Sequence, residues 1–463
     1  MERMTKEGRF GRIGLIAILS QDAWPEGFVN HAATGLTQAR SALQEMGFQV
    51  VDCGAVARTW ADMATQATKL TSERINALVL LTPTWLYANS AVVSALRCRV
   101  PVIVWADATA GRYGICGGGV LKGSLDEVGV FCSLVYGCSD EPETLAEIRD
   151  LCLGATAAMR LRGLKFGIGG SCSMGMYTSM VDASQWSTQF GIGVDGWEQV
   201  ELIRRAELVP ENDARSFLQW MKETFERIDP SDAVMLHQIK LYLALKQMVR
   251  ENEYDFITVK CLPELPACHT TLCLAVSMLN STMDAGGPKE TTVCGDETDS
   301  NGALTMQMLK HVTGEAVLFA DLLQLDRKDN LLRLCNCGAQ AVDFAPHPKD
   351  VWWMKEGMPQ FVWKIGTTHP QYVSKPGHMT LARLSRVQGK YVMLITEGEA
   401  IAADREMLRE TNDHIAHTFV RLDAPAGTFV KNVRSNHIHA AYGSVSRALE
   451  EACRVLAIDP IIV

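Results

Sequence analysis

Short apolar runs alternate with helix-length segments through the first third of the chain. The runs at residues 12–19, 48–52, 75–81 and 101–105 consist mainly of apolar side chains. Such runs are typical of strands that helices cover on both faces. Strands that alternate with helices predict right-handed crossovers and a parallel sheet. The loops that leave the carboxyl ends of these strands are then the expected location of functional side chains.

A second α/β unit is predicted to begin near residue 165. Residues 165–170 and 255–261 have the composition of buried strands, and residues 231–250 show helical periodicity. A shorter strand at 291–294 leads into the polar sequence Gly-Asp-Glu-Thr-Asp-Ser-Asn-Gly at 295–302. Because the predicted strands end in polar loops, we expect this unit also to carry its chemistry at strand ends.

The pattern changes in the last third, where Gly and Pro separate several short strands. After a predicted strand at 316–321, we expect strands at 331–342 and 361–365 and a strand pair across 379–401. This pair alternates apolar and polar residues around Val-Gln-Gly-Lys at 387–390, which is typical of a β-hairpin. Short strands of this kind predict a small barrel or sandwich.

The expected fold class is therefore α/β with three domains. Two Rossmann-like parallel-sheet domains, at residues 1–164 and 165–312, are predicted to precede a β-rich, barrel-like domain at residues 313–463. The length of 463 residues suits three domains of about 150 residues each.

Composition and charge narrow the function classes. Hydrophobic residues make up 47% of the chain and charged residues 21%, which is the balance of a globular rather than a disordered protein. The net charge is −9 and no dense run of Lys and Arg occurs, which argues against a nucleic-acid or membrane partner. With no apolar signal-peptide core and no run of about 20 apolar residues, we expect a cytoplasmic location. The 14 cysteines include no CxxC pair and are interpreted as reduced packing residues.

Acidic side chains crowd together directly after the predicted strand at 291–294. Asp296, Glu297 and Asp299 occupy three of four consecutive positions. The ordinary interpretation is a solvated turn in which Asp299 caps the following helix. The position at the carboxyl end of a strand favours a functional role instead.

Asp321 and a pair of histidines are further candidates. Asp321 ends an apolar run, so its carboxylate must leave the core or find a partner. His437 and His439 lie two positions apart and share a face if that segment is extended. Carboxylates with imidazole suit a divalent ion such as Mn²⁺. The residues alone are compatible with either a metalloenzyme or ordinary strand-end turns.

Several ordered motifs carry a resemblance to a known family. They are Ser-Met-Gly at 173–175, Glu-Thr-Asp-Ser-Asn-Gly at 297–302, Phe-Ala-Asp at 319–321 and Ser-Asn-His at 435–437. In these motifs the chain resembles the L-fucose isomerase family, to which L-arabinose isomerases are more distantly related. The gap of 24 residues between Glu297 and Asp321 (321 − 297) fits the spacing of two catalytic acids in that family.

The resemblance implies a metal-dependent aldose–ketose isomerase that moves a proton between C1 and C2 of an open-chain sugar through an enediol. It implies that Glu297, Asp321 and His437 bind a divalent ion, usually Mn²⁺, and that the two carboxylates act as the acid and base. It also implies substrate contacts from three further residues, Asn436, Glu264 and Trp85.

Assembly is implied by the same resemblance. In the family, the segment matched by Thr82–Trp85 brings a tryptophan into the active site of a neighbouring subunit. A homo-oligomer, hexameric or trimeric, with active sites between subunits is therefore expected.

Two other functions stay open from the sequence. One is a non-catalytic sugar-binding or sensor protein, and the other is a sugar epimerase that uses the same metal and carboxylates. The loop at residues 20–25 departs from the basic, glycine-containing loop of fucose isomerases. The sequence therefore leaves open whether the sugar is a deoxy, plain or sulfonated aldose.

Overall fold

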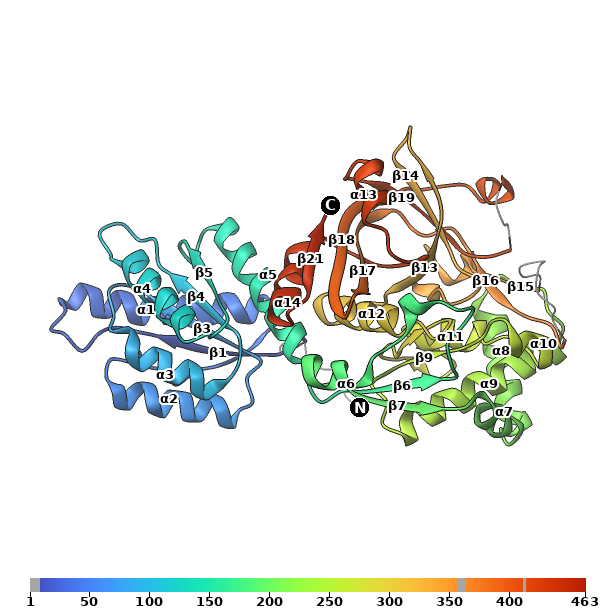
Figure 1. Cartoon of the computed structure of the whole chain (residues 1–463), viewed down its shortest axis with the longest axis horizontal. Coiled ribbons are helices and arrows are strands. Elements are labelled where there is room, and N and C mark those ends of the chain that lie inside the picture. The colour runs from blue at the N-terminus through green and yellow to red at the C-terminus, as the bar shows by residue number, and fades with distance from the viewer. Residues whose placement is uncertain (1–8, 356–363, 411–413) are drawn as a thin grey trace. The chain divides into compact units, whose positions relative to one another are not determined.

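The computed structural model describes residues 9–355, 364–410 and 414–463. Their chain forms two compact units (Figure 1). The first unit contains the chain up to Arg162 together with Arg447–Leu456, and the second contains Gly163–Ser446 and Ala457–Val463. The finer division into three domains stays a prediction.

The first unit is built on a parallel five-stranded sheet, as the alternating apolar runs predict. Its strands run in the order β2-β1-β3-β4-β5. Every residue of the central strand β3 is buried, which is why its sequence is an unbroken apolar run that ends in Thr. The strands are β1 (Arg12–Ala17), β2 (Gln49–Val51), β3 (Ala77–Thr82), β4 (Val102–Ala106) and β5 (Cys132–Tyr136).

Helices cover this sheet and include one from near the end of the chain. The last helix of the chain packs closely against α5, because a Cβ atom at Gly154 would lie 2.3 Å from the Ala448 carbonyl oxygen. The Ser133 hydroxyl also donates to Glu451 Oε1 at 2.7 Å. The helices are α1 (Glu26–Glu45), α2 (Trp60–Ser72), α3 (Ala88–Cys98), α4 (Gly114–Glu127), α5 (Pro142–Met159) and α14 (Ser446–Val455).

The second unit contains another parallel sheet, with the strand order β12-β9-β6-β7. Its strands are β6 (Lys165–Gly169), β7 (Gly193–Trp197), β9 (Phe256–Val259) and β12 (Val293–Gly295). Its helices are α6 (Ala183–Gln185), α7 (Gln199–Glu207), α8 (Glu211–Thr224), α9 (Asp232–Glu251), α10 (Glu264–Cys268), α11 (Cys273–Asn280) and α12 (Ser300–Thr313). Helix α12 is buried along almost its whole length, so it holds the loop before it firmly.

The same unit contains a mixed, β-rich sheet, visible in orange and red in Figure 1. Its order is β17-β20-β13-β14-β19-β18-β21, and β17 also pairs with β18, so six of the strands form a closed ring. The strands are β13 (Leu318–Asp326), β14 (Leu331–Cys335), β17 (Gly377–Val387), β18 (Lys390–Ala400), β19 (His417–Leu422), β20 (His437–Tyr442) and β21 (Asp459–Ile462). Helix α13 (Ala426–Asn432) lies between β19 and β20 in the sequence.

Short elements complete the second unit. They are β8 (Arg227–Ile228), β10 (Met283–Asp284), β11 (Gly287–Pro288), β15 (Trp352–Met354) and β16 (His369–Gln371), and single helical turns at Tyr177–Ser179, Trp186–Phe190, Val342–Phe344, Pro348–Asp350 and Arg405–Glu410.

The strand predictions for the last third are confirmed in part. Val387 pairs with Lys390, so the predicted hairpin is confirmed at the predicted turn. The strand expected at 331–342 ends at Cys335, because the Asn336 side chain accepts hydrogen bonds from two following backbone N–H groups and forms a turn. The strand expected at 361–365 is wrong at Lys364 and Ile365, and its first three residues lie outside the described residues.

Among the described residues, no helix is both long enough and apolar enough to cross a bilayer.

Candidate metal centre

The loop between β12 and α12 places Glu297 in an uncommon backbone conformation. Glu297 and Thr298 both have positive φ angles, of 54° and 53°. Such conformations are rare for residues with a side chain and persist where surrounding contacts enforce them. Here Thr298 N donates to the Val259 carbonyl at 2.9 Å and Thr298 Oγ1 donates to the Ser171 carbonyl at 2.8 Å. The loop is therefore held by the ends of the neighbouring strands.

Asp321 and His437 come from two neighbouring strands of the β-rich sheet. Asp321 on β13 is the direct cross-strand partner of His437 on β20. Residues directly opposite each other in an antiparallel pair project from the same face. The register therefore brings together a carboxylate and an imidazole that lie 116 positions apart in the sequence (437 − 321).

Both predicted carboxylate ligands lie close to the predicted histidine ligand. His437 Nε2 lies 3.2 Å from Glu297 Oε2 and 3.4 Å from Asp321 Oδ1. Within the described residues, Glu297 Oε2 and His437 Nε2 are buried without a hydrogen-bond partner. Buried polar atoms without partners are rare in native proteins and call for an explanation.

A divalent metal ion fits this arrangement. Adjacent ligand atoms that each lie about 2.1 Å from one ion are about 3 Å apart, close to the separations seen here. Two carboxylates with one imidazole form the donor set of a hard or borderline ion. A bound ion would also give Glu297 Oε2 and His437 Nε2 the partner that the protein does not supply.

Two asparagine side chains orient the carboxylate of Asp321. Asn336 Nδ2 donates to Asp321 Oδ2 at 3.0 Å, and Asn436 Nδ2 donates to Asp321 Oδ1 at 3.1 Å. The side chain of Asp321 is 26% exposed, whereas those of Glu297 and His437 are 6% and 1% exposed. Solvent, and hence a small ligand, reaches this group of side chains from the Asp321 side.

The imidazole of His437 is held from behind by a buried carboxylate. His437 Nδ1 lies 2.7 Å from Asp299 Oδ2. Asp299 also caps α12, because its Oδ1 accepts a hydrogen bond from Gly302 N at 2.9 Å. The cap predicted from the sequence is thus confirmed, but the same carboxylate also contacts the candidate metal ligand.

The carboxylates and His437 shift one another's protonation. Burial lowers the pKa of His437, but the charge of Asp321, the hydrogen bond to Asp299 and the nearby Glu297 carboxylate outweigh burial and raise the pKa to about 10. Burial, together with the charge of Glu297, raises the pKa of Asp296 to about 7. Burial also raises the pKa of Asp321, and the charge of Glu297 acts in the same direction. A cation is therefore favoured among these carboxylates.

The sequence predicted four residues of this centre and missed others. Glu297, Asp321, His437 and Asn436 lie together, and the roles assigned to them stay predictions. Arg383, which pairs with Asp299, was missed, as was Asn336. No local signal identifies Arg383, since it occupies an alternating strand and its partner is 84 positions away.

Glu264 and Trp85 are the other two predicted substrate contacts. Glu264, at the start of α10, pairs with Lys260 at 2.9 Å, and its side chain is 58% exposed. Trp85 belongs to the first unit, in the loop between β3 and α3, and is 39% exposed. Neither is among the side chains described above at the metal centre, and their proposed sugar contacts stay predictions.

A second group of possible ligand atoms lies at the rim of the β-rich sheet. Atoms of His378, Glu397 and Asp423 lie within 4.8 Å of one another. The Glu397 carboxylate already accepts hydrogen bonds from the Ser444 hydroxyl at 2.9 Å and the Ser446 backbone at 3.2 Å. These bonds fix the turn before α14, which is a structural explanation for this carboxylate.

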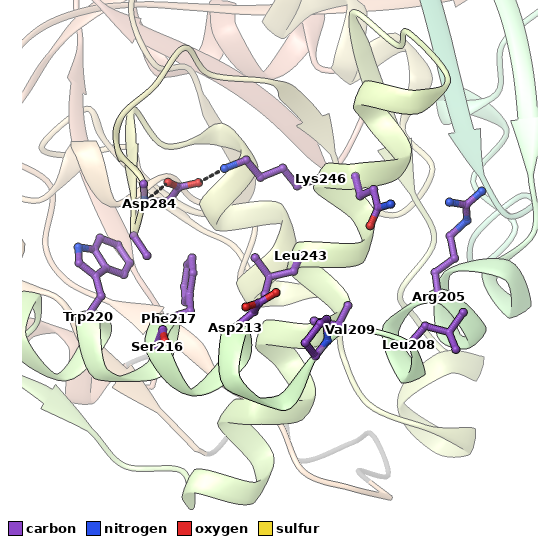
Figure 2. A pocket seen from close by; sticks show the side chains of 14 residues that line it. Arg205, Leu208, Val209, Asp213, Ser216, Phe217, Trp220, Leu243, Lys246 and Asp284 are labelled. Carbon is purple, nitrogen blue, oxygen red and sulfur yellow. Dashed lines mark hydrogen bonds and ion pairs between the residues drawn. The ribbon is translucent and has the colours of Figure 1, made fainter.

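A cavity of about 660 Å³ lies between α8, α9 and the turn that joins β10 to β11 (Figure 2). Phe217 and Trp220 line it on one side, and Lys246 reaches across to Asp284. The Asp284 carboxylate also accepts hydrogen bonds from Tyr242 and from Gly286 N. None of the predicted site residues is among the described residues that line this cavity.

Replacing Asp284 by Asn is expected to destabilise the protein near neutral pH. Burial alone would raise the pKa of Asp284, but the hydrogen bonds from Lys246 and Tyr242 lower it below its usual value. The ionised form therefore stabilises the fold above the unfolded pKa of about 3.9, and this stabilisation disappears as pH falls through the folded pKa. We expect a loss of about 1–3 kcal/mol in urea unfolding at neutral pH.

The matched control is Asp232→Asn, because Asp232 forms a surface ion pair with Lys222 and is 62% exposed. Its effect should be below about 1 kcal/mol. A destabilisation by Asp284→Asn that is the same at pH 3 and pH 7 would contradict the electrostatic explanation.

The carboxyl-terminal part of the chain matches the model of a known protein family. Residues 334–462 match the model of the L-fucose isomerase C-terminal domain. Sulfoquinovose isomerase from Clostridium sp. (strain MSTE9) is 23% identical over 275 residues, which is 56% of this chain and 59% of that protein. L-fucose isomerase from Salmonella typhi is 21% identical over 355 residues, which is 65% of this chain and 58% of that protein. These matches are to the C-terminal domain and to members of the L-fucose isomerase family, and they support the resemblance seen in the motifs.

The likeness to these proteins covers only part of their length. The chain spans about half to three fifths of the length of the family members that it matches. Among solved structures, a glucose-galactose binding protein from Geobacillus stearothermophilus aligns at 14% identity with a TM-score of 0.16, over 66% of this chain and 92% of that one. A score this low carries no argument about fold or function.

Proposed function

We propose that the protein is a metal-dependent aldose–ketose isomerase that acts on an open-chain sugar. The approach of Glu297 Oε2 and Asp321 Oδ1 to His437 Nε2 supports this proposal most strongly, because it brings two carboxylates and an imidazole within 3.2 and 3.4 Å at a buried site. Relatives named L-fucose isomerase and sulfoquinovose isomerase support the same reaction class.

Proton transfer between C1 and C2 is assigned to the two carboxylates. A divalent ion, proposed to be Mn²⁺, would polarise the sugar carbonyl and stabilise negative charge on the sugar oxygens. One carboxylate of the Glu297–Asp321 pair removes the proton from the hydroxyl-bearing carbon next to the carbonyl, which gives an enediolate, and becomes a carboxylic acid. A carboxylic acid of the pair then returns a proton to the former carbonyl carbon, while the hydroxyl proton moves from one sugar oxygen to the other through the enediol. A positioned acid or base of this kind contributes roughly 10²–10⁴-fold to the rate.

The surrounding residues assist this chemistry by position. Asn436 donates to Asp321 Oδ1 and lies next to His437, so it can hold both the carboxylate and a sugar hydroxyl. Asp321 is the most exposed of the three proposed ligands, so the sugar is proposed to bind on that side of the centre. Glu264 and Trp85 are proposed as further sugar contacts, Trp85 in a homo-oligomer where it would reach the site of another subunit.

Metal removal tests the proposal directly. Treatment with a chelator should abolish turnover of aldoses, and Mn²⁺ should restore it, measured on a panel of plain, deoxy and sulfonated sugars. Solvent deuterium should enter the product at C1 or C2, because proton exchange with the carboxylates accompanies transfer. Full turnover by the metal-free protein, or binding of a sugar without C–H exchange, would contradict the proposed reaction.

A further inference from the structure

A buried ion pair lies directly behind the candidate metal ligand His437. The side chains of Arg383 and Asp299 are 3% and 0% exposed. Arg383 Nη2 donates to Asp299 Oδ1 at 3.0 Å, and Nη1 donates to Oδ2. Both oxygens of the carboxylate thus face both terminal nitrogens of the guanidinium, which is the planar, two-point geometry that Arg alone provides.

This pair determines which nitrogen of His437 is free. Asp299 Oδ2 lies 2.7 Å from His437 Nδ1. A carboxylate bound to a guanidinium offers only acceptors, so Nδ1 must carry the proton in this contact. When the imidazole gives up its second proton to bind a metal ion, its lone pair is then on Nε2, the atom that faces Glu297 and Asp321.

Arg383 is itself fixed by the groups around it. Its Nη1 lies 3.3 Å from His439 Nε2, and its Nη2 donates to the Thr178 carbonyl at 3.3 Å. His439, which the sequence left without a role, thus lies against the guanidinium. Residue 302 is a glycine and leaves room for both neighbouring side chains. A Cβ atom there would lie 2.6 Å from Asp299 Oδ2 and 2.7 Å from His439 Nε2.

We propose that Arg383 is a positioning residue for metal binding, which acts through Asp299 to hold Nε2 of His437 toward Glu297 and Asp321. This inference rests on the proposed metal site and adds a residue outside its ligands. Lys cannot reproduce the two-point contact of Arg383 with Asp299, because an ammonium group is a single point charge and cannot hold both oxygens of Asp299 in one plane.

Arg383→Lys tests the inference through metal affinity rather than turnover. The metal-free protein is titrated with Co²⁺ and the visible absorption of the bound ion is followed. We expect the dissociation constant for Co²⁺ to rise about 10–100-fold, the usual effect of losing a group that orients a histidine ligand. The control is Arg386→Lys on the same strand, since Arg386 pairs with Asp182 at the surface and should leave the affinity unchanged.

Asp299→Asn tests the route of the effect. If Arg383 acts through Asp299, Arg383→Lys should cause almost no additional loss of affinity in a protein that already carries Asp299→Asn. Folding of each variant is checked by circular dichroism of the metal-free protein. If Arg383→Lys does not fold, Asp299→Asn carries the test, and an unchanged Co²⁺ affinity in that variant overturns the inference.

The outcomes separate this inference from the proposed function. An unaltered protein that binds no Co²⁺ overturns the proposed metal site and the inference with it. If the unaltered protein binds Co²⁺ and Arg383→Lys binds it equally tightly, the inference alone is overturned. A full additional loss in the double variant shows that Arg383 acts independently of Asp299 and also overturns it.

Discussion

Glu297→Gln is expected to abolish metal binding and turnover without lowering the stability of the metal-free protein. The substitution keeps the size of the side chain but removes the charge of an oxygen that faces His437 Nε2 at 3.2 Å. Turnover should fall by at least about 10²–10⁴-fold, because a ligand and a candidate proton carrier are lost together. Metal binding is measured by Mn²⁺ titration and stability by urea unfolding in the presence of a chelator.

The stability result distinguishes a functional residue from a structural one. In the metal-free protein Glu297 lies near two other acidic side chains, and its charge raises the pKa of both Asp296 and Asp321. Removing this charge relieves repulsion from Asp296 and Asp321 and also removes the attraction to His437 at 3.2 Å. Because these two effects oppose each other, the free energy of unfolding should change little. Glu211→Gln, at an exposed ion pair with Lys240, should change neither metal binding nor turnover. A variant of Glu297 that unfolds more easily but keeps full activity would remove this residue from the mechanism.

The sequence predicted the parallel sheets well because burial alone determines their pattern. In β3 every residue is buried, so the apolar run of the sequence and the strand of the structure nearly coincide. Where a strand is exposed, the apolar run ends before the strand does. β13 continues to Asp326, five residues past the predicted end at Asp321 (326 − 321), because its backbone pairs with β14 while its side chains there are half-buried or exposed.

The metal centre was predicted only as far as its motifs reach. The acidic cluster at the end of β12 and the Asn-His pair could be read as separate candidates, and the family resemblance connected them. Their contact depends on the pairing of β13 with β20 and on the left-handed backbone at Glu297, neither of which has a local sequence signal.

Arg383 shows why the supporting residues escaped prediction. The alternation of β17 correctly gives a hairpin, but alternation assigns a charged residue to the solvent face. The side chain is buried instead, because the carboxylate that pairs with it is supplied by a distant loop. A buried charge is tolerated only with such a partner, and the partner is visible only in three dimensions.

Gly302→Ala is expected to damage the metal centre although residue 302 provides no ligand atom. A Cβ atom at this position would lie 2.6 Å from Asp299 Oδ2 and 2.7 Å from His439 Nε2. Neither neighbour can yield easily, because Asp299 is held by Arg383 and His437 and is completely buried. We expect a destabilisation of about 1–3 kcal/mol, as for other overpacked buried sites. Displacement of Asp299 should also weaken Mn²⁺ binding by about 10-fold or more, since it orients His437.

Gly427→Ala provides the matched control for this prediction. Gly427 also lies in a helix of the second unit, α13, but a Cβ atom there would meet nothing within 4 Å. Because Ala favours the helix over Gly, the control should be neutral or more stable by up to about 1 kcal/mol. Urea unfolding and Mn²⁺ titration of the two variants give opposite expectations for the same chemical change. Equal behaviour of the two would show that Asp299 moves without consequence, and that the glycine ending the Glu-Thr-Asp-Ser-Asn-Gly motif is not needed for close packing at His437.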